Sequence, residues 1–135
     1  MSAIAALEAD ILRVLSEAGE VRNALGSPLR VSGGEGQKPG FPFLRVSAHE
    51  VRGDGVGTVG PREHRLSLEV LSRAGGRAEA SRLVALIADT LRGATLTPEG
   101  QHVVLFHPVY ADVFLRADGT TFRGLLRLRA LMEEE

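Results

Sequence analysis

The chain has 135 residues, of which 44% are hydrophobic, and its 16 basic and 17 acidic residues leave a formal net charge of -1. This length suits one domain with a substantial core, and the near-neutral charge argues against a protein whose main task is to coat nucleic acid or an anionic membrane. There is no cysteine, which excludes disulfides, thiolate chemistry and cysteine-based zinc sites.

The sequence contains no apolar run that approaches the roughly 20 residues needed to cross a bilayer. Its first residues also lack a basic region followed by a continuous apolar segment. We therefore expect a soluble, cytoplasmic protein with no membrane partner.

The first predicted element is an amphipathic helix. Ser2 can cap its start, and Gly19 follows its last turn. Its apolar residues recur with helical spacing and are Ile4, Leu7, Ile11, Val14, Leu15 and Ala18. Residues 21–25 can extend a short helical turn, and Leu29 and Val31 can form a brief strand before a glycine-rich loop.

Two segments with alternating apolar residues predict half-buried strands. In residues 41–52, the apolar set is Leu44, Val46 and Ala48, and the polar set is Arg45, Ser47 and His49. In residues 65–70, the apolar set is Leu66, Leu68 and Val70, and the polar set is Arg65, Ser67 and Glu69.

The segment between these strands, residues 53–61, holds four glycines and one proline in nine positions. Such a segment cannot order itself by packing, which leaves two interpretations. It is either a long hairpin tip without a role, or a flexible arm that becomes ordered only on a partner. The candidate contact residues of such an arm are Asp54, Val56, Thr58 and Val59.

A second amphipathic helix is predicted over residues 77–92, ended by Gly93. Its apolar stripe consists of Ala80, Leu83, Val84, Ile87, Ala88 and Leu91. Residues 103–106 then predict a short strand before Pro108, and only residues 133–135 look like a solvated tail.

The clearest pattern is a C-terminal hairpin over residues 109–130, with Asp118 and Gly119 as the two central residues of a tight turn. Counting outward from that turn gives one apolar face. Its pairs are Leu115 with Phe122, Val113 with Gly124, Ala111 with Leu126, and Val109 with Leu128. A slip of one residue would expose this set to water, so burial should enforce the register.

The opposite face of this hairpin mixes aromatic, aliphatic and cationic side chains. We select Tyr110, Phe114, Arg123, Leu125, Arg127 and Arg129 as candidate interface residues. Two interpretations stay open. The arginine stems can shield the apolar groups on an ordinary sheet surface, or the whole set can form a protein interface, where aromatic residues and arginine are enriched.

The order of these elements predicts an α+β fold, with a mostly antiparallel sheet and two amphipathic helices packed on one face, in a single domain over residues 1–135. The standard phosphate-binding, nucleophile-elbow and HExxH motifs are absent. His49 and His64 should lie close together across their hairpin, but no third ligand is fixed nearby. We predict no catalytic, cofactor or metal site, and no enzyme.

Several segments together resemble a known family. They are the strand FPFLRVS, the strand-to-helix unit RLSLEVLSRAGGRAEASRLVALIADTLRG and the closing strand in DGTTFRGLLRLRALME. With the N-terminal helix and the glycine-rich arm, they are similar to the tail terminator proteins of long-tailed phages and gene transfer agents, also described as tail completion or head-tail joining proteins. The resemblance covers nearly all of the chain.

The resemblance implies a subunit of a hexameric ring at the head-proximal end of the tail tube. It further implies contacts with the tail tube protein and with the head connector, and DNA that passes through the ring without specific binding. Such a ring would be assembled in the bacterial cytoplasm. The alternative is a small-ligand or regulatory binding module, which predicts a monomer or dimer with a preformed pocket between helix and sheet.

Overall fold

The computed structural model describes residues 1–33, 39–53 and 60–135. Its elements are α1 (Ala3–Glu17), α2 (Gly19–Leu25), β1 (Val31–Ser32), β2 (Phe43–Arg52), β3 (Arg62–Ser72), α3 (Gly76–Arg92), β4 (Gln101–Leu115) and β5 (Phe122–Glu134). The strands form one sheet in the order β1-β2-β3-β5-β4, in which only the β1–β2 pair is parallel. The predicted α+β class with a mostly antiparallel sheet is confirmed.

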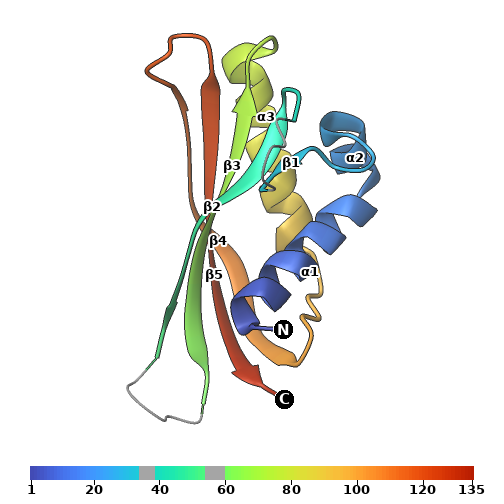
Figure 1. The fold of residues 1–135 in the computed structure, drawn as a ribbon, viewed down its shortest axis with the longest axis vertical. Coiled ribbons are helices and arrows are strands. Elements are labelled where there is room, and N and C mark those ends of the chain that lie inside the picture. The colour runs from blue at the N-terminus through green and yellow to red at the C-terminus, as the bar shows by residue number, and fades with distance from the viewer. Residues whose placement is uncertain (34–38, 54–59) are drawn as a thin grey trace.

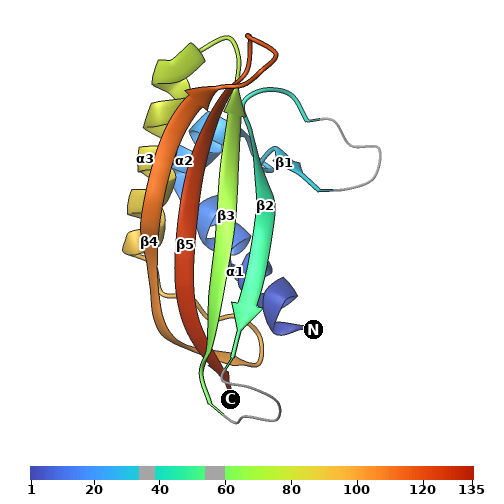
Figure 2. The ribbon, with the colours of Figure 1, turned by 90° about the vertical axis from the view of Figure 1, so that its left-hand side faces the viewer.

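The helices lie on one side of the sheet, and the other side faces solvent (Figure 1). The view onto this second side shows the four long strands next to one another with the helices behind them (Figure 2). We call this second side the open face. Among the described residues, no helix is long and apolar enough to span a membrane.

The first helix begins as its sequence predicts. The side chain of Ser2 accepts a hydrogen bond from the backbone N–H of Ala5 at 3.1 Å. The helix ends at Glu17, but Gly19 does not lead into a loop. It begins α2, so the structure has a third helix where the sequence suggested only a helical turn. Val21 and Leu25 of α2 are fully buried, and this burial stabilises a helix that is too short to form alone.

Helix α3 packs across β3, β5 and β4. Its buried residues are Ala80, Leu83, Val84, Ile87, Ala88 and Leu91, which is the predicted stripe. Gly124 of β5 lies directly beneath this helix, and a Cβ atom there would overlap the side chain of Val84 and lie 3.2 Å from the carbonyl oxygen of Ala80. Glycine at this position lets the helix approach the sheet closely.

The C-terminal hairpin has the predicted register near its turn, from Leu115↔Phe122 to Tyr110↔Arg127. The turn itself is different. Asp118 does not have a positive φ, and only Gly119 does, at 73°. Instead of a two-residue turn, residues 117–120 form a four-residue loop, closed by Arg116 N–H donating to the carbonyl of Thr121. The register is the predicted one because the expected two-residue turn and the observed four-residue loop are both centred on the peptide bond between Asp118 and Gly119.

The carboxylate of Asp118 stabilises this loop. It accepts hydrogen bonds from the backbone N–H groups of Thr120 and Thr121 and from the Thr121 hydroxyl, at 2.7 to 2.9 Å. These bonds, led by the one from Thr120, hold the pKa of Asp118 well below its usual value.

Strand β4 is a single long edge strand, although the sequence predicted a separate strand over residues 103–106. It continues through Pro108, which an edge strand tolerates because one row of its backbone groups needs no partner. Val104 and Val109 are extra residues at two bulges, so Pro108 and not Val109 faces Leu128. The strand also pairs with Glu133 and Glu134, which therefore belong to β5 and not to a solvated tail.

A third bulge changes the predicted faces of β2. Val46 faces Leu68 and Ala48 faces Ser67, so Ser47 is an extra residue. Beyond it, the alternation is inverted: Ala48 is exposed on the open face, and the side chain of His49 lies beneath α1.

Candidate functional site

The open face carries a buried carboxylate between two arginines. The side chain of Glu69 is only 3% exposed, and its two oxygens lie 3.0 Å from Arg45 Nε and 2.8 Å from Arg123 Nε. The second contact lacks hydrogen-bond geometry and is an ion pair. The Arg123 guanidinium also lies over the ring of Phe114, 4.5 Å from its centre. This group therefore links β2, β3, β5 and β4 across the open face.

A second carboxylate, Glu63, bridges two further arginines. Its oxygens lie 2.6 Å from Arg129 Nε and 2.8 Å from Arg65 Nε. The hydrogen bond from Arg129 is the main reason that the pKa of Glu63 lies below its ordinary value. Both arginines are thus occupied within the subunit.

Tyr110 and Arg127 lie beside these ion pairs. The Arg127 guanidinium lies 5.0 Å from the centre of the Tyr110 ring, and the Tyr110 hydroxyl donates a 2.7 Å hydrogen bond to Asp112. This bond raises the pKa of Tyr110. No ion pair with a carboxylate is found for Arg127 within the described part of the chain.

The structure brings the six candidate residues of the hairpin together on the open face, but they differ in accessibility. Tyr110 and Phe114 are exposed, at 47% and 39%, and Arg127 is exposed as well. Arg123 and Arg129 are engaged by carboxylates, and Leu125 is only 3% exposed. The other four candidate residues, Asp54, Val56, Thr58 and Val59, lie outside the described residues.

Strand β4 carries a row of exposed apolar side chains, which we call the β4 strip: Val104, Val109, Tyr110, Phe114 and Leu115. They are five of the nine large hydrophobic residues that are exposed in the described part of the chain. The sequence pattern had placed Val109 and Leu115 on the buried face. Both are about half exposed on β4, which is the edge strand of the sheet.

The helix side of the sheet contains a chain of three polar side chains. Glu8 Oε2 of α1 lies 2.7 Å from His49 Nδ1 of β2, and His49 Nε2 lies 2.8 Å from His64 Nδ1 of β3. His64 is 1% exposed. Burial, followed by the charges of His49 and Arg62, lowers the pKa of His64 from 6.5 to about 4. The predicted proximity of the two histidines is thus confirmed, and their partner Glu8 was not foreseen.

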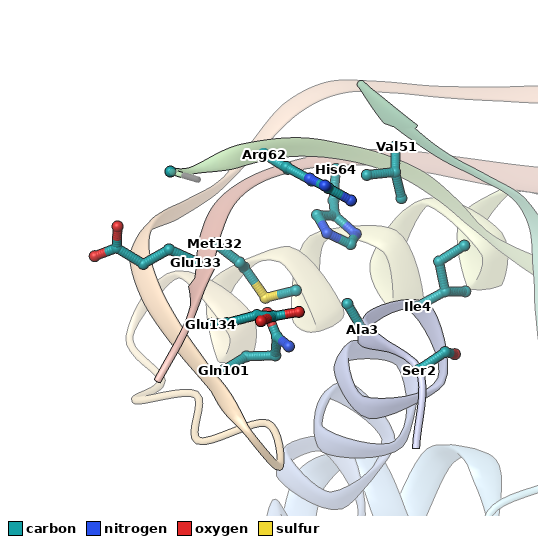
Figure 3. A pocket seen from close by; sticks show the side chains of 11 residues that line it. Ser2, Ala3, Ile4, Val51, Arg62, His64, Gln101, Met132, Glu133 and Glu134 are labelled. Atoms are coloured by element: carbon teal, nitrogen blue, oxygen red, sulfur yellow. The ribbon is translucent and has the colours of Figure 1, made fainter. Parts of the chain in front are cut away.

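The ring of His64 also lines a pocket of about 460 Å³ between the start of α1 and the ends of the strands (Figure 3). Its apolar wall includes Ala3, Ile4 and Met132, and its polar wall includes Gln101 and Glu134. The described residues contain no group of three or more potential ligands arranged for a metal ion. A second hollow, of about 540 Å³, lies on the open face beside Tyr110 and Arg127.

Comparisons with known proteins agree on one fold. The family described as "Tail completion protein gp17" matches residues 9–133. A chain from the structure "Virion of native gene transfer agent (GTA) particle" is 22% identical, with a TM-score of 0.83 over 98% of this chain and 99% of that one. The "Structure of bacteriophage SPP1 gp17 protein" is 19% identical, with a TM-score of 0.60 over 95% and 89%. No curated protein sequence matches the chain.

Proposed function

The chain belongs to the tail completion protein gp17 family, and from this premise we propose that it forms a hexameric ring at the head-proximal end of a phage-like tail tube. In this position it ends polymerisation of the tube and joins the tail to the head connector. The family consists of structural virion proteins and not of enzymes. We further propose that the ring is assembled in the bacterial cytoplasm and that DNA passes through it without specific binding.

The β4 strip is the observation that carries this proposal. Exposed apolar side chains that gather on one element are typical of a surface that another protein covers. Tyr110 and Phe114 lie at its border with the open face, each beneath an arginine. Aromatic residues with arginine are enriched where interfaces are fully buried.

A ring that closes by head-to-tail contacts needs two different surfaces on each subunit. We propose that the β4 strip with Arg127 is one of them. Residues 53–61 supply the second contact, with the next subunit or with the tail tube protein. The edge strand itself is protected against uncontrolled pairing, because two bulges and Pro108 interrupt its free side. Side chains, more than strand pairing, should therefore form the contact.

Two substitutions on this surface test the proposal. Phe114→Ser removes an exposed ring, and Arg127→Glu reverses an exposed charge. We expect both variants to fold normally and to yield few joined particles, counted by electron microscopy of tails assembled with tube and connector proteins. The matched control is Arg82→Glu, which reverses an exposed charge on α3 and should join tails normally.

The same preparations distinguish the alternative of a ligand-binding module. Sedimentation in the presence of tube protein should show this chain on the tube end as a ring. A chain that stays monomeric with tube protein, or variants with an unchanged yield of joined tails, would contradict the proposed role of this surface.

A further inference from the structure

The Glu8–His49–His64 chain ends in the pocket of Figure 3. His64 Nδ1 is occupied by His49, whereas no hydrogen bond is found for His64 Nε2 within residues 1–33, 39–53 and 60–135. Only 1% of the residue is accessible, so the ring is almost completely buried where it meets the pocket. A buried imidazole with one nitrogen facing a pocket is a fixed and oriented polar group, and within the described part of the chain this nitrogen has no hydrogen-bond partner.

The hydrogen bonds between Glu8, His49 and His64 determine whether His64 Nε2 is a hydrogen-bond donor or an acceptor. An ionised Glu8 only accepts, so His49 holds a proton on Nδ1. When His49 is neutral, its Nε2 accepts from His64 Nδ1–H, and His64 Nε2 is left as a bare acceptor. The pocket then presents an acceptor that is held in place by groups from α1 and β2.

The other polar residues of the pocket also favour a ligand that donates hydrogen bonds. Glu134 contributes a carboxylate and Gln101 a side-chain amide, and both lie on the same side of the pocket (Figure 3). Arg62, Glu133 and Glu134 are its charged residues and sum to a net charge of -1. The apolar wall of Ala3, Ile4 and Met132 suits an aliphatic stem.

From this arrangement we infer that the pocket binds the guanidinium group of an arginine side chain presented by a partner protein. Acceptors that are spread over one wall match the planar fan of five guanidinium donors better than the compact ammonium group of lysine. The inference goes beyond the ring role and can be tested on the isolated subunit, whether or not a ring forms.

The test is an NMR titration of the ¹⁵N-labelled full chain with propylguanidinium at pH 7.5. We expect a saturable shift of the His64 Nε2 resonance. Glu134→Gln should weaken binding by about 5-fold, the effect of losing one partly exposed ion pair. Arg62→Gln should strengthen it, because a repelling charge is removed. Glu99→Gln is the control, since Glu99 is exposed and does not line the pocket.

Acidification gives an independent readout. Protonation of His64, whose pKa is lowered to about 4 mainly by burial, places a proton on Nε2, where it opposes a guanidinium. The charged groups involved are Glu8 on α1, His49 on β2, Arg62 on β3, and Glu133 and Glu134 on β5. Binding should therefore weaken as the pH falls toward 4.

Two results would overturn the inference. One is the absence of any His64 Nε2 shift at saturating propylguanidinium. The other is a saturable shift with propionate that Arg62→Gln abolishes, because the pocket would then be a carboxylate site. Neither result bears on the ring proposal, which is tested separately by the tail-joining assay.

Discussion

At the scale of single residues, the open face depends on Glu69. This carboxylate is almost fully buried, while its partners Arg45 and Arg123 are about one third exposed. Glu69→Gln keeps the shape and removes the charge, so both guanidinium groups lose their counter-ion. We expect the free energy of unfolding in urea to fall by about 1–2 kcal/mol, less than for a fully buried pair because water reaches both arginines. Glu50→Gln, at an exposed ion pair, should change it by less than about 0.5 kcal/mol.

His64 makes the stability of the protein depend on pH. Its pKa is about 4 in the folded chain and 6.5 in the ordinary, unfolded state, mainly because the ring is buried. Between these values the unfolded chain binds a proton that the folded chain does not, so stability is lost as the pH falls from 6.5 to 4. The loss should approach about 3 kcal/mol over this window. In His64→Gln, unfolding curves at pH 7 and pH 4.5 should differ clearly less than in the parent chain; an unchanged difference would contradict this assignment.

At the scale of elements, the contact between α3 and β5 depends on the absence of a side chain at Gly124. Gly124→Ala would press against Val84 and the backbone of Ala80, and we expect a loss of about 1–3 kcal/mol in the free energy of unfolding. Val84→Ala in the same chain should recover part of this loss. Gly93→Ala is the control, because its nearest neighbour would lie 3.9 Å away. Additive effects of the Gly124 and Val84 substitutions would argue against a steric cause.

The edge strand β4 shows how one element combines two requirements. Its inner side chains Val103, Phe106 and Val113 pack against the core, whereas the β4 strip stays accessible. The bulges at Val104 and Val109 turn these two side chains out of the regular alternation. An edge strand can thus offer apolar side chains to a partner without offering an uninterrupted row of backbone groups.

At the scale of the whole molecule, residues 53–61 connect β2 and β3 at the end of the sheet where the ladder closes with Arg52↔Glu63. Deleting residues 56–59 leaves this ladder and the core residues intact. We expect a thermal unfolding midpoint close to that of the parent chain, because the residues of the ladder and of the described core lie outside the deletion. The yield of joined tails should fall, since we propose that these residues contact the next subunit or the tube. A deletion variant that joins tails normally would exclude them from the interface.

Much of the fold was accessible from the sequence because it depends on local periodicity. The stripes of α1 and α3 and the register from Leu115↔Phe122 to Tyr110↔Arg127 follow from apolar residues that must be buried together. The open face with Tyr110, Phe114 and Arg127 follows from the same register. Family resemblance rested on these same patterns, and the match to residues 9–133 confirms it.

Only the tertiary structure decided which strand lies at the edge and where the extra residues fall. A bulge adds one residue without changing the composition of a strand, so the pattern of residues 41–52 could not show that His49 turns toward Glu8. Likewise, the apolar character of Leu115 does not reveal that about half of it is exposed. Alternation within a strand states which side chains share a face, whereas exposure depends on the neighbours that the complete fold places above that face.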